Sequence, residues 1–241
     1  MARNRDARMT APRAILIELE GVLVETHALR RDALVRALDE MGAALSPVDF
    51  DDHCHGLPVR AAITAAITVR ALEPTLDATD TDLAAVRAEA NFMRSVGTGL
   101  TLVDGAREAL AGLRAGATLA IVTRASRRET DAMLAMSGME FEFDCVICSD
   151  DVPGAEKPEP LAHQSALARL SRRRAMRARD AIALEDGRAG IVAARRAGIP
   201  CVAVGNMPAF RALDADGYLP TLRGVTLESL DALGGRGDPV T

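Results

Sequence analysis

The chain has 241 residues, of which 49% are hydrophobic and 26% are charged, and its formal net charge is −5. This length predicts one domain with an insertion or two small domains of a globular protein. The negative charge and an aromatic content of 2% argue against nucleic acid as the main partner, and no apolar run approaches the roughly 18 residues that would span a bilayer.

The first segment of the chain, residues 1–12, is basic and poor in apolar residues. It lacks the apolar stretch of a secretory signal, so we expect a disordered lead and a cytoplasmic protein. The chain has four cysteines, too few for a disulfide scaffold at this length. They therefore favour buried thiols in a reducing compartment.

The first apolar run, Ala14–Leu19, predicts a buried strand. Roughly 95 residues separate it from the next apolar run, far more than one crossover helix needs. Three amphipathic stripes fill this interval, and they consist of Leu34, Ala37, Leu38 and Met41, of Val59, Ile63, Ala66 and Ile67, and of Leu83, Val86, Ala90 and Met93. We therefore predict a helical cap domain over residues 27–100, inserted into a core of residues 13–26 and 101–232. Gly42 would end the first of these helices, and Asp80 or Thr81 would cap the third.

Four further apolar runs follow the predicted cap, at Thr118–Thr123, Cys145–Cys148, Ala181–Leu184 and Cys201–Val204. Runs without polar alternation are typical of parallel strands that are buried on both faces. Segments of helical spacing separate them, and this alternation predicts a doubly wound, Rossmann-like α/β core with a parallel sheet. The glycine-rich residues 233–241 are predicted to form a flexible tail.

Polar side chains follow these strands at the ends where an open parallel sheet binds its ligands. They are Glu18 and Glu20, Thr123 and Arg124, Asp150 and Asp151, and Glu185 and Asp186. Carboxylates at three adjacent strand ends would repel one another without a cation among them. The ligand types are all oxygen, which suits magnesium rather than zinc, and an anionic substrate, most simply a phosphate, would complete the charge balance.

Lys157 is the single lysine among 29 basic residues, and the other 28 are arginines. It follows the third of the core strands in a Lys-Pro-Glu-Pro turn. Arginine and lysine are not interchangeable where a compact charge is needed. A lysine retained at this one position therefore indicates a binding or catalytic role.

These residues and their context resemble the haloacid-dehalogenase superfamily of hydrolases, in the subgroup with a helical cap that includes phosphoglycolate phosphatases and β-phosphoglucomutases. The resemblance covers residues 13–220 and rests on four ordered segments, ILIELEGVLVET, LAIVTRAS, EKPEP and ALEDGRAGIVAARRAGIPCVAV, with LVDGAREALAGLRAGA before the second. It implies a magnesium-dependent hydrolase of small phosphorylated metabolites, monomeric or homodimeric, without a membrane or nucleic-acid partner.

The resemblance also implies roles for the strand-end residues. Glu18 takes the place of the nucleophile, which forms an acyl phosphate with the substrate, and Glu20 takes the place of the general acid and base. Thr123 would bind the transferring phosphoryl group, helped by the N-terminus of the helix that follows. Lys157 would neutralise charge on the phosphate and the nucleophile.

Metal and substrate ligands follow from the same resemblance. Magnesium would be held by Glu18, by the backbone carbonyl of Glu20, by Asp186 and, directly or through water, by Glu185. Substrate contacts would come from Thr123, Arg124 and Lys157 in the core and from Arg30 and Arg60 in the cap. Arg30 stands where the mutase branch has a histidine, which weakens a phosphoglucomutase interpretation.

The first motif departs from the family, because Glu18 and Glu20 stand where the family has two aspartates. Each glutamate adds one methylene and moves its carboxylate by up to about 1.5 Å, and a misplacement of that order costs roughly 100-fold in rate. Two hypotheses stay open: an active hydrolase, and a catalytically impaired member that binds a phosphometabolite or a protein partner. A haloacid dehalogenase ranks third, because its branch keeps no second carboxylate where Glu20 stands.

Other motifs in the sequence give little indication of function. Cys145 and Cys148 form a CxxC inside a predicted strand, where positions i and i+3 face opposite sides, so we expect core thiols without a redox role. His53, Cys54 and His55 resemble part of a metal site, but no second group of ligands stands at a suitable spacing in the sequence. We therefore predict that they form a loop of the cap. In the fourth motif Gly187 replaces a serine common in the family, and Leu161 replaces an aspartate that often follows the lysine.

Overall fold

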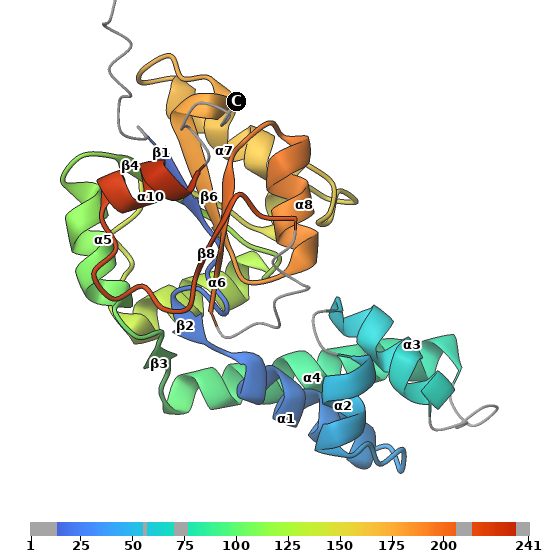
Figure 1. The fold of residues 1–241 in the computed structure, drawn as a ribbon. Coiled ribbons are helices and arrows are strands. Elements are labelled where there is room, and N and C mark those ends of the chain that lie inside the picture. Colours follow the sequence, from blue (N-terminus) through green and yellow to red (C-terminus); the bar gives the residue numbers. More distant parts are fainter. Residues whose placement is uncertain (1–13, 55–56, 70–76, 206–213, 235–241) are drawn as a thin grey trace, which may run out of the picture. The chain divides into compact units, whose positions relative to one another are not determined.

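The computed structural model describes residues 14–54, 57–69, 77–205 and 214–234 of the chain. These residues divide into two compact units, each shown in Figure 1. The larger unit contains residues 14–24, 102–134, 138–205 and 214–234, and the helical unit contains the described residues of 25–101 together with 135–137. The predicted lead at 1–12, the tail from 235 onward and His55 lie outside the described residues.

A six-stranded parallel sheet forms the centre of the larger unit, which confirms the predicted α/β Rossmann-like fold. Its strands follow the order β5-β4-β1-β6-β7-β8, and all neighbouring pairs are parallel. Their bounds are Ala14–Ile17 for β1, Thr118–Val122 for β4, Cys145–Ile147 for β5, Ala181–Glu185 for β6, Cys201–Val204 for β7 and Gly217–Leu219 for β8.

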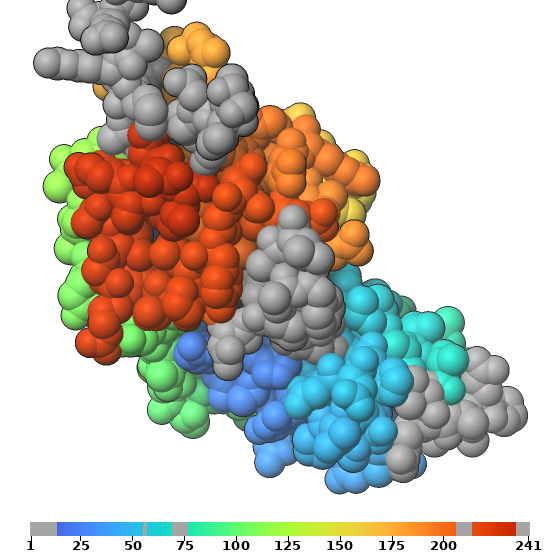
Figure 2. All heavy atoms as spheres, viewed as in Figure 1, coloured from blue at the N-terminus to red at the C-terminus, as the bar shows by residue number. Residues whose placement is uncertain are grey.

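Helices cover both faces of this sheet, as its unbroken apolar strands require. They are α5 (Ala106–Arg114), α6 (Arg127–Ser137), α7 (Leu161–Ser171), α8 (Arg188–Arg196) and α10 (Leu227–Leu233). Apolar residues of α7 and α8 pack with alternate residues of β1, β4, β6 and β7 in one buried cluster. Helices α5 and α10 lie on the other face (Figure 1), and the segment 214–234 is seen in red on the surface of the larger unit in Figure 2.

The register of the sheet aligns three strand ends. Ala14 of β1 is paired with Thr118 of β4 and with Ala181 of β6. Four residues further along, Glu18 therefore lies level with Val122 on one side and with Glu185 on the other. The backbone N–H of Glu18 donates to the carbonyl of Leu184 at 2.9 Å, which continues the β1–β6 pairing up to this position.

Two features of the sheet differ from the prediction. Strand β8 was not expected, because its three residues are only partly buried and form no apolar run. The ends of β1 and β5 are not adjacent, since β4 lies between them. Asp151, after β5, forms ion pairs with Arg127 at 2.6 Å and Arg169 at 2.9 Å. Its charge is thus balanced locally and adds nothing to the carboxylates that follow β1 and β6.

The helical unit consists of α1 (His27–Asp39), α2 (Pro47–His53), α3 (Val59–Val69) and α4 (Ala78–Thr98), packed around an apolar core of their own. Helix α4 begins earlier than expected, because Asp77 accepts the N–H groups of Thr79 and Asp80 and so caps it. Helix α2 was not predicted, since Phe50 is the one buried residue in its seven positions. The chain passes between the units through β2 (Val24–Glu25) and β3 (Thr101–Leu102), which form a two-stranded sheet.

None of the helices in the described ranges is both long and apolar enough to cross a membrane. All four cysteines are free thiols, and burial raises the pKa of Cys54, Cys145, Cys148 and Cys201. A raised thiol pKa disfavours the reactive thiolate. Of the two CxxC thiols, Cys148 is buried and Cys145 is partly buried, and the absence of a redox role stays a prediction.

Candidate functional site

The ammonium group of Lys157 joins the ends of three neighbouring strands. Its Nζ donates to Glu18 Oε2 at 2.7 Å, to Glu185 Oε1 at 2.7 Å and to the backbone carbonyl of Val122 at 2.9 Å. These three acceptors are the positions that the register places side by side on β1, β6 and β4. An ammonium group has three N–H donors, so all the donors of Lys157 are in use.

The charges of Lys157 and Glu185 hold each other in the ionised form. Burial acts to lower the pKa of Lys157, but the adjacent Glu18 and Glu185 outweigh it and raise the pKa to about 12. Burial would likewise raise the pKa of Glu185, and Lys157 and His163 shift it below its usual range instead. The Lys157 side chain is 2% exposed. A cation so deeply buried is tolerated because it is paired with carboxylates and fully hydrogen-bonded.

Glu18 is buried and uses both of its carboxylate oxygens. Oε2 accepts from Lys157, and Oε1 accepts from the backbone N–H of Leu19 at 2.8 Å. Glu20 follows in a turn that is closed by the Gly21 N–H on the carbonyl of Val24 at 2.8 Å, and its side chain is half-buried. The chain therefore turns away from the sheet directly after Glu18 and presents both glutamates at the end of β1.

Two glycines provide the space for the two carboxylates at the end of β6, those of Glu185 and Asp186. A Cβ on Gly190 of α8 would lie 1.9 Å from Glu185 Oε2, and one on Gly21 would lie 2.3 Å from Asp186 Oδ2. Gly21 also has a φ of +75°, a conformation that L side chains rarely adopt. Each glycine is thus required by the acidic side chain that packs against its backbone.

The first test concerns this packing. Gly190→Ala is expected to lower the free energy of unfolding by about 1–3 kcal/mol, because the added methyl group displaces a buried carboxylate from its place beside Lys157. Gly187→Ala is the matched control, since nothing lies within 4 Å of a Cβ there, and it should change stability by less than about 0.5 kcal/mol. Urea denaturation measures both. Equal effects of the two substitutions would contradict the assigned packing.

Asp186 contributes a third acidic side chain. Part of this side chain is open to solvent, yet the surrounding protein, followed by the charges of Glu18 and Glu185, raises its pKa, while Arg124 acts in the opposite direction. Negative charge is costly here, because one buried lysine faces three carboxylates.

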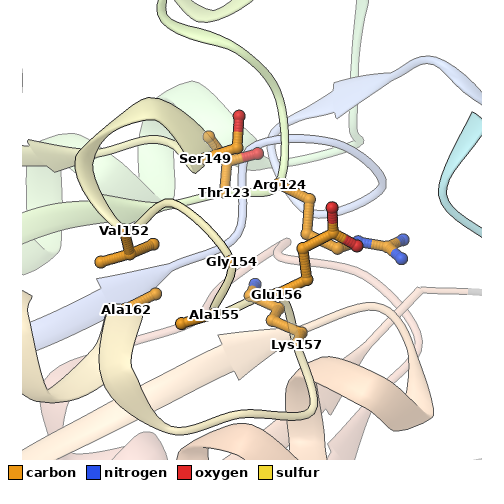
Figure 3. A pocket seen from close by; sticks show the side chains of 9 residues that line it. All are labelled: Thr123, Arg124, Ser149, Val152, Gly154, Ala155, Glu156, Lys157 and Ala162. Carbon is orange, nitrogen blue, oxygen red and sulfur yellow. The ribbon is translucent and has the colours of Figure 1, made fainter.

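Thr123 directly follows β4 and lines a small pocket of about 60 Å³ together with Arg124 and Lys157. Figure 3 shows the nine lining residues, with Val152, Ala155 and Ala162 on the apolar side of the pocket. The Thr123 hydroxyl oxygen accepts the N–H of Ala125 at 3.3 Å. Its own proton remains available to donate, so the pocket offers a hydroxyl donor beside two cationic side chains.

The N-terminus of α6 was expected to assist anion binding, and its first turn is already bonded. The N–H of Glu129 donates to Ser126 Oγ at 3.3 Å, and Glu129 Oε2 in return accepts the N–H of Ser126 at 2.9 Å. The N–H of Arg127 donates to the Asp150 carboxylate. These bonds satisfy donors that a helix N-terminus otherwise offers to an anion. Anion binding by Thr123, Arg124 and Lys157 stays a prediction.

The donor chemistry of the site fits a magnesium ion. Glu18, Glu185 and Asp186 supply only oxygen atoms, which are the ligands that magnesium prefers. Within the described residues, no three His, Cys, Asp or Glu side chains are grouped as a ligand set. Magnesium does not require such a set, because it usually binds one or two carboxylates and completes its shell with waters and substrate phosphate.

The two arginines predicted to bind substrate belong to the helical unit. The Arg30 guanidinium lies over the Phe92 ring, 3.5 Å from its centroid. Arg60 forms an ion pair with Asp82. These contacts account for both side chains within the unit, and their role in substrate binding stays a prediction.

Sequence reasoning missed His163. This residue of α7 is completely buried, and its Nε2 lies 3.0 Å from Glu185 Oε1. A histidine inside an apolar helix face carries no motif, so no sequence signal marked it. The backbone carbonyl of Val122 was missed for a similar reason, because every residue offers the same carbonyl group.

Known proteins resemble this chain over most of its length. The model of the haloacid dehalogenase-like hydrolase family matches residues 15–204. The validoxylamine A 7'-phosphate phosphatase of Streptomyces hygroscopicus subsp. limoneus is 30% identical over 192 residues, which cover 78% of this chain and 83% of that protein. The phosphoglycolate phosphatase of Cupriavidus necator is 28% identical over 189 residues and 78% of each chain. The β-phosphoglucomutase structure from Clostridium difficile has the same fold, with a TM-score of 0.78 over 93% of this chain and 98% of that one at 16% identity.

Proposed function

Because the chain belongs to the haloacid dehalogenase-like hydrolase family, we propose that it hydrolyses small phosphate monoesters through a phosphoryl group carried on Glu18. The observation that carries this proposal is the contact of Lys157 with Glu18, Glu185 and the Val122 carbonyl at the ligand-binding edge of the sheet. Two relatives whose names describe phosphatases support it.

The chemistry follows from the side chains at that edge. A carboxylate oxygen of Glu18 attacks phosphorus and forms an O–P bond, while the bond to the substrate oxygen breaks. Glu20 donates its proton to this leaving oxygen and then accepts a proton from the water that attacks phosphorus. The Glu18–phosphorus bond breaks in this second step, which releases inorganic phosphate and restores the carboxylate.

The remaining residues hold the phosphoryl group. Thr123 donates its hydroxyl proton to a phosphoryl oxygen, and Lys157 and Arg124 balance the anionic charge. Magnesium would be held by Glu18, the carbonyl of Glu20 and Asp186, with Glu185 directly or through water. When bound, the ion offsets the repulsion between the carboxylates and the phosphate.

A second candidate function is a phosphometabolite-binding protein without turnover. The observation that favours it is the state of Glu18, whose two oxygens are both engaged by Leu19 and Lys157. An attacking oxygen must leave one of these partners. The glutamate side chain is longer than that of an aspartate. Its carboxylate must therefore move further to leave Lys157 and reach phosphorus.

Turnover decides between the two. The purified chain is expected to hydrolyse p-nitrophenyl phosphate, and one member or more of a panel of phosphorylated sugars and hydroxy acids, with Mg²⁺ and not with EDTA. Glu18→Gln keeps the size of the side chain, removes its charge and should lower kcat by about 10³-fold or more. Thermal melts show metal binding separately, because an ion bound only to the folded state raises Tm.

Each outcome has one meaning. Turnover that Glu18→Gln abolishes supports the hydrolase. A rise in Tm with Mg²⁺ and inorganic phosphate, weakened by Asp186→Asn, without turnover, supports the binding protein. A chain with no turnover and no shift with either ligand contradicts both.

A further inference from the structure

A completely buried histidine, His163, lies next to the candidate site. Neither of its ring nitrogens has a well-aligned hydrogen bond to any described residue, although Nε2 lies 3.0 Å from Glu185 Oε1. Buried polar atoms are almost always hydrogen-bonded, because an unsatisfied one costs free energy. A small rotation of the ring would complete this bond.

The same carboxylate oxygen is already bonded. Glu185 Oε1 accepts from Lys157 Nζ at 2.7 Å, and the other two donors of that ammonium are used by Glu18 and the Val122 carbonyl. Lys157 therefore has no donor left for a phosphate oxygen. To bind substrate it must leave one of its three acceptors. Of these three acceptors, Glu185 Oε1 lies within hydrogen-bond distance of a second buried side chain that can donate an N–H, that of His163.

We propose that His163 is a positioning residue that takes the place of Lys157 on Glu185 when phosphate binds. The Nε2–H of His163 then donates to Glu185 Oε1, one N–H of Lys157 turns to the phosphate, and the Lys157 contact with Glu18 is kept. This inference rests on the proposed binding of phosphate at this site. It goes beyond that proposal, because it assigns to His163 the exchange of partners that frees the lysine.

The physical reason for such an exchange is the burial of Glu185. This carboxylate is 1% exposed, so water does not replace a donor that departs. The His163 ring is completely buried beside this carboxylate, and a neutral imidazole has one N–H, whose place on Nδ1 or Nε2 is set by the hydrogen bond it makes. The donor on Nε2 keeps Glu185 satisfied without adding a second positive charge beside Lys157.

Two substitutions separate positioning from space filling. His163→Phe keeps the ring volume and removes the donor, whereas His163→Gln keeps an N–H donor at similar reach. We expect His163→Phe to raise both KM for p-nitrophenyl phosphate and Kd for inorganic phosphate about tenfold, which corresponds to the loss of one hydrogen bond to a charged group. The value of kcat should stay within about threefold, because the Lys157–phosphate contact is made in the ground state and the transition state alike. His163→Gln should restore both constants to within about threefold of wild type.

A spectroscopic measurement on the wild-type chain does not depend on the variants. In ¹⁵N-histidine NMR spectra, addition of inorganic phosphate with Mg²⁺ should fix the proton of His163 on Nε2 and move its resonance toward that of a hydrogen-bonded N–H. The resonance is assigned by its loss in His163→Gln. If His163→Phe fails to fold, this measurement alone decides.

The outcomes separate this inference from the proposed function. Wild-type turnover together with an unchanged His163 resonance, or with a His163→Phe variant whose KM and phosphate Kd are those of wild type, overturns the inference and leaves the hydrolase intact. A His163→Gln variant as weak as His163→Phe overturns it as well. Absence of both turnover and phosphate binding in the wild type overturns the proposed function, and the inference with it.

Discussion

Replacing Lys157 by methionine is expected to lower the free energy of unfolding by about 3–5 kcal/mol and to abolish turnover. The side chain keeps its length and loses the charge, which leaves Glu18 and Glu185 buried beside each other without the ammonium that both contact at 2.7 Å. Urea denaturation and the p-nitrophenyl phosphate assay measure the two effects. Arg174→Met is the control for loss of one positive charge, because Arg174 is exposed, and it should change stability by less than about 0.5 kcal/mol.

A double variant shows whether the loss comes from unpaired charge. Adding Glu185→Gln to Lys157→Met removes one of the two stranded carboxylates, so part of the stability should return. Lys157→Arg, in contrast, keeps the charge, but its planar guanidinium does not match three acceptors arranged around one point, and it should fall between wild type and methionine. A double variant less stable than Lys157→Met would contradict the paired cluster.

Reverting both glutamates of the first motif to aspartate is expected to increase turnover by more than the two single reversions combined. Glu18→Asp alone leaves a short nucleophile facing a long acid and base, and Glu20→Asp alone leaves the reverse mismatch. Residues that act as one unit show non-additive effects, and a misplacement of about 1 Å costs roughly 100-fold. The rates of wild type, both single variants and the double variant complete the cycle.

The structure supplies a second measurement for this cycle. Glu18 Oε2 lies 2.7 Å from Lys157 Nζ, so the shorter aspartate withdraws a carboxylate from the buried lysine. The Glu18→Asp variant should therefore lose stability, whereas Glu20→Asp, at a half-buried position, should lose less. A different set of rates would contradict the matched pair: an inert wild type, full activity in Glu18→Asp alone, and no further gain in the double variant. In that case Glu20 is not a compensating partner. The chain would then be a phosphatase disabled by its nucleophile.

Much of the core could be predicted from the sequence, because its strands are apolar on both faces and their residues therefore show no alternation. The same property predicted that Glu18 and Glu185 lie at the carboxyl ends of strands, on the same side of the sheet. The edge strand β8 could not be predicted, since Gly217–Leu219 is short and partly exposed. A local pattern of apolar residues indicates which segments are buried. Strand β8 is held in place by its backbone pairing with β7 instead, and a local pattern does not indicate such pairing.

The site was harder to predict wherever partners come from distant segments. Asp151 was grouped with the other strand-end carboxylates, because its position along the chain does not show that Arg127 and Arg169 neutralise it. His163 was missed since its significance lies in the 3.0 Å approach to Glu185, across two elements of different type. The family pattern supplied Lys157 as a charge near the nucleophile. Only the sheet register explains why its three donors meet Glu18, Glu185 and a carbonyl together.

The central position of β1 has a consequence for how the chain folds as it is synthesised. This strand is made well before its two neighbours in the sheet, which are residues 118–122 and 181–185. The contact between Glu18 and Lys157 likewise closes a loop of 139 residues. Such non-local pairings form late, because the entropy of closing a long loop must be lost before they are made. Strand β1 therefore keeps at least one edge unpaired until residues 181–185 have been made, and the contacts of Lys157 with Glu18 and Glu185 form only after that.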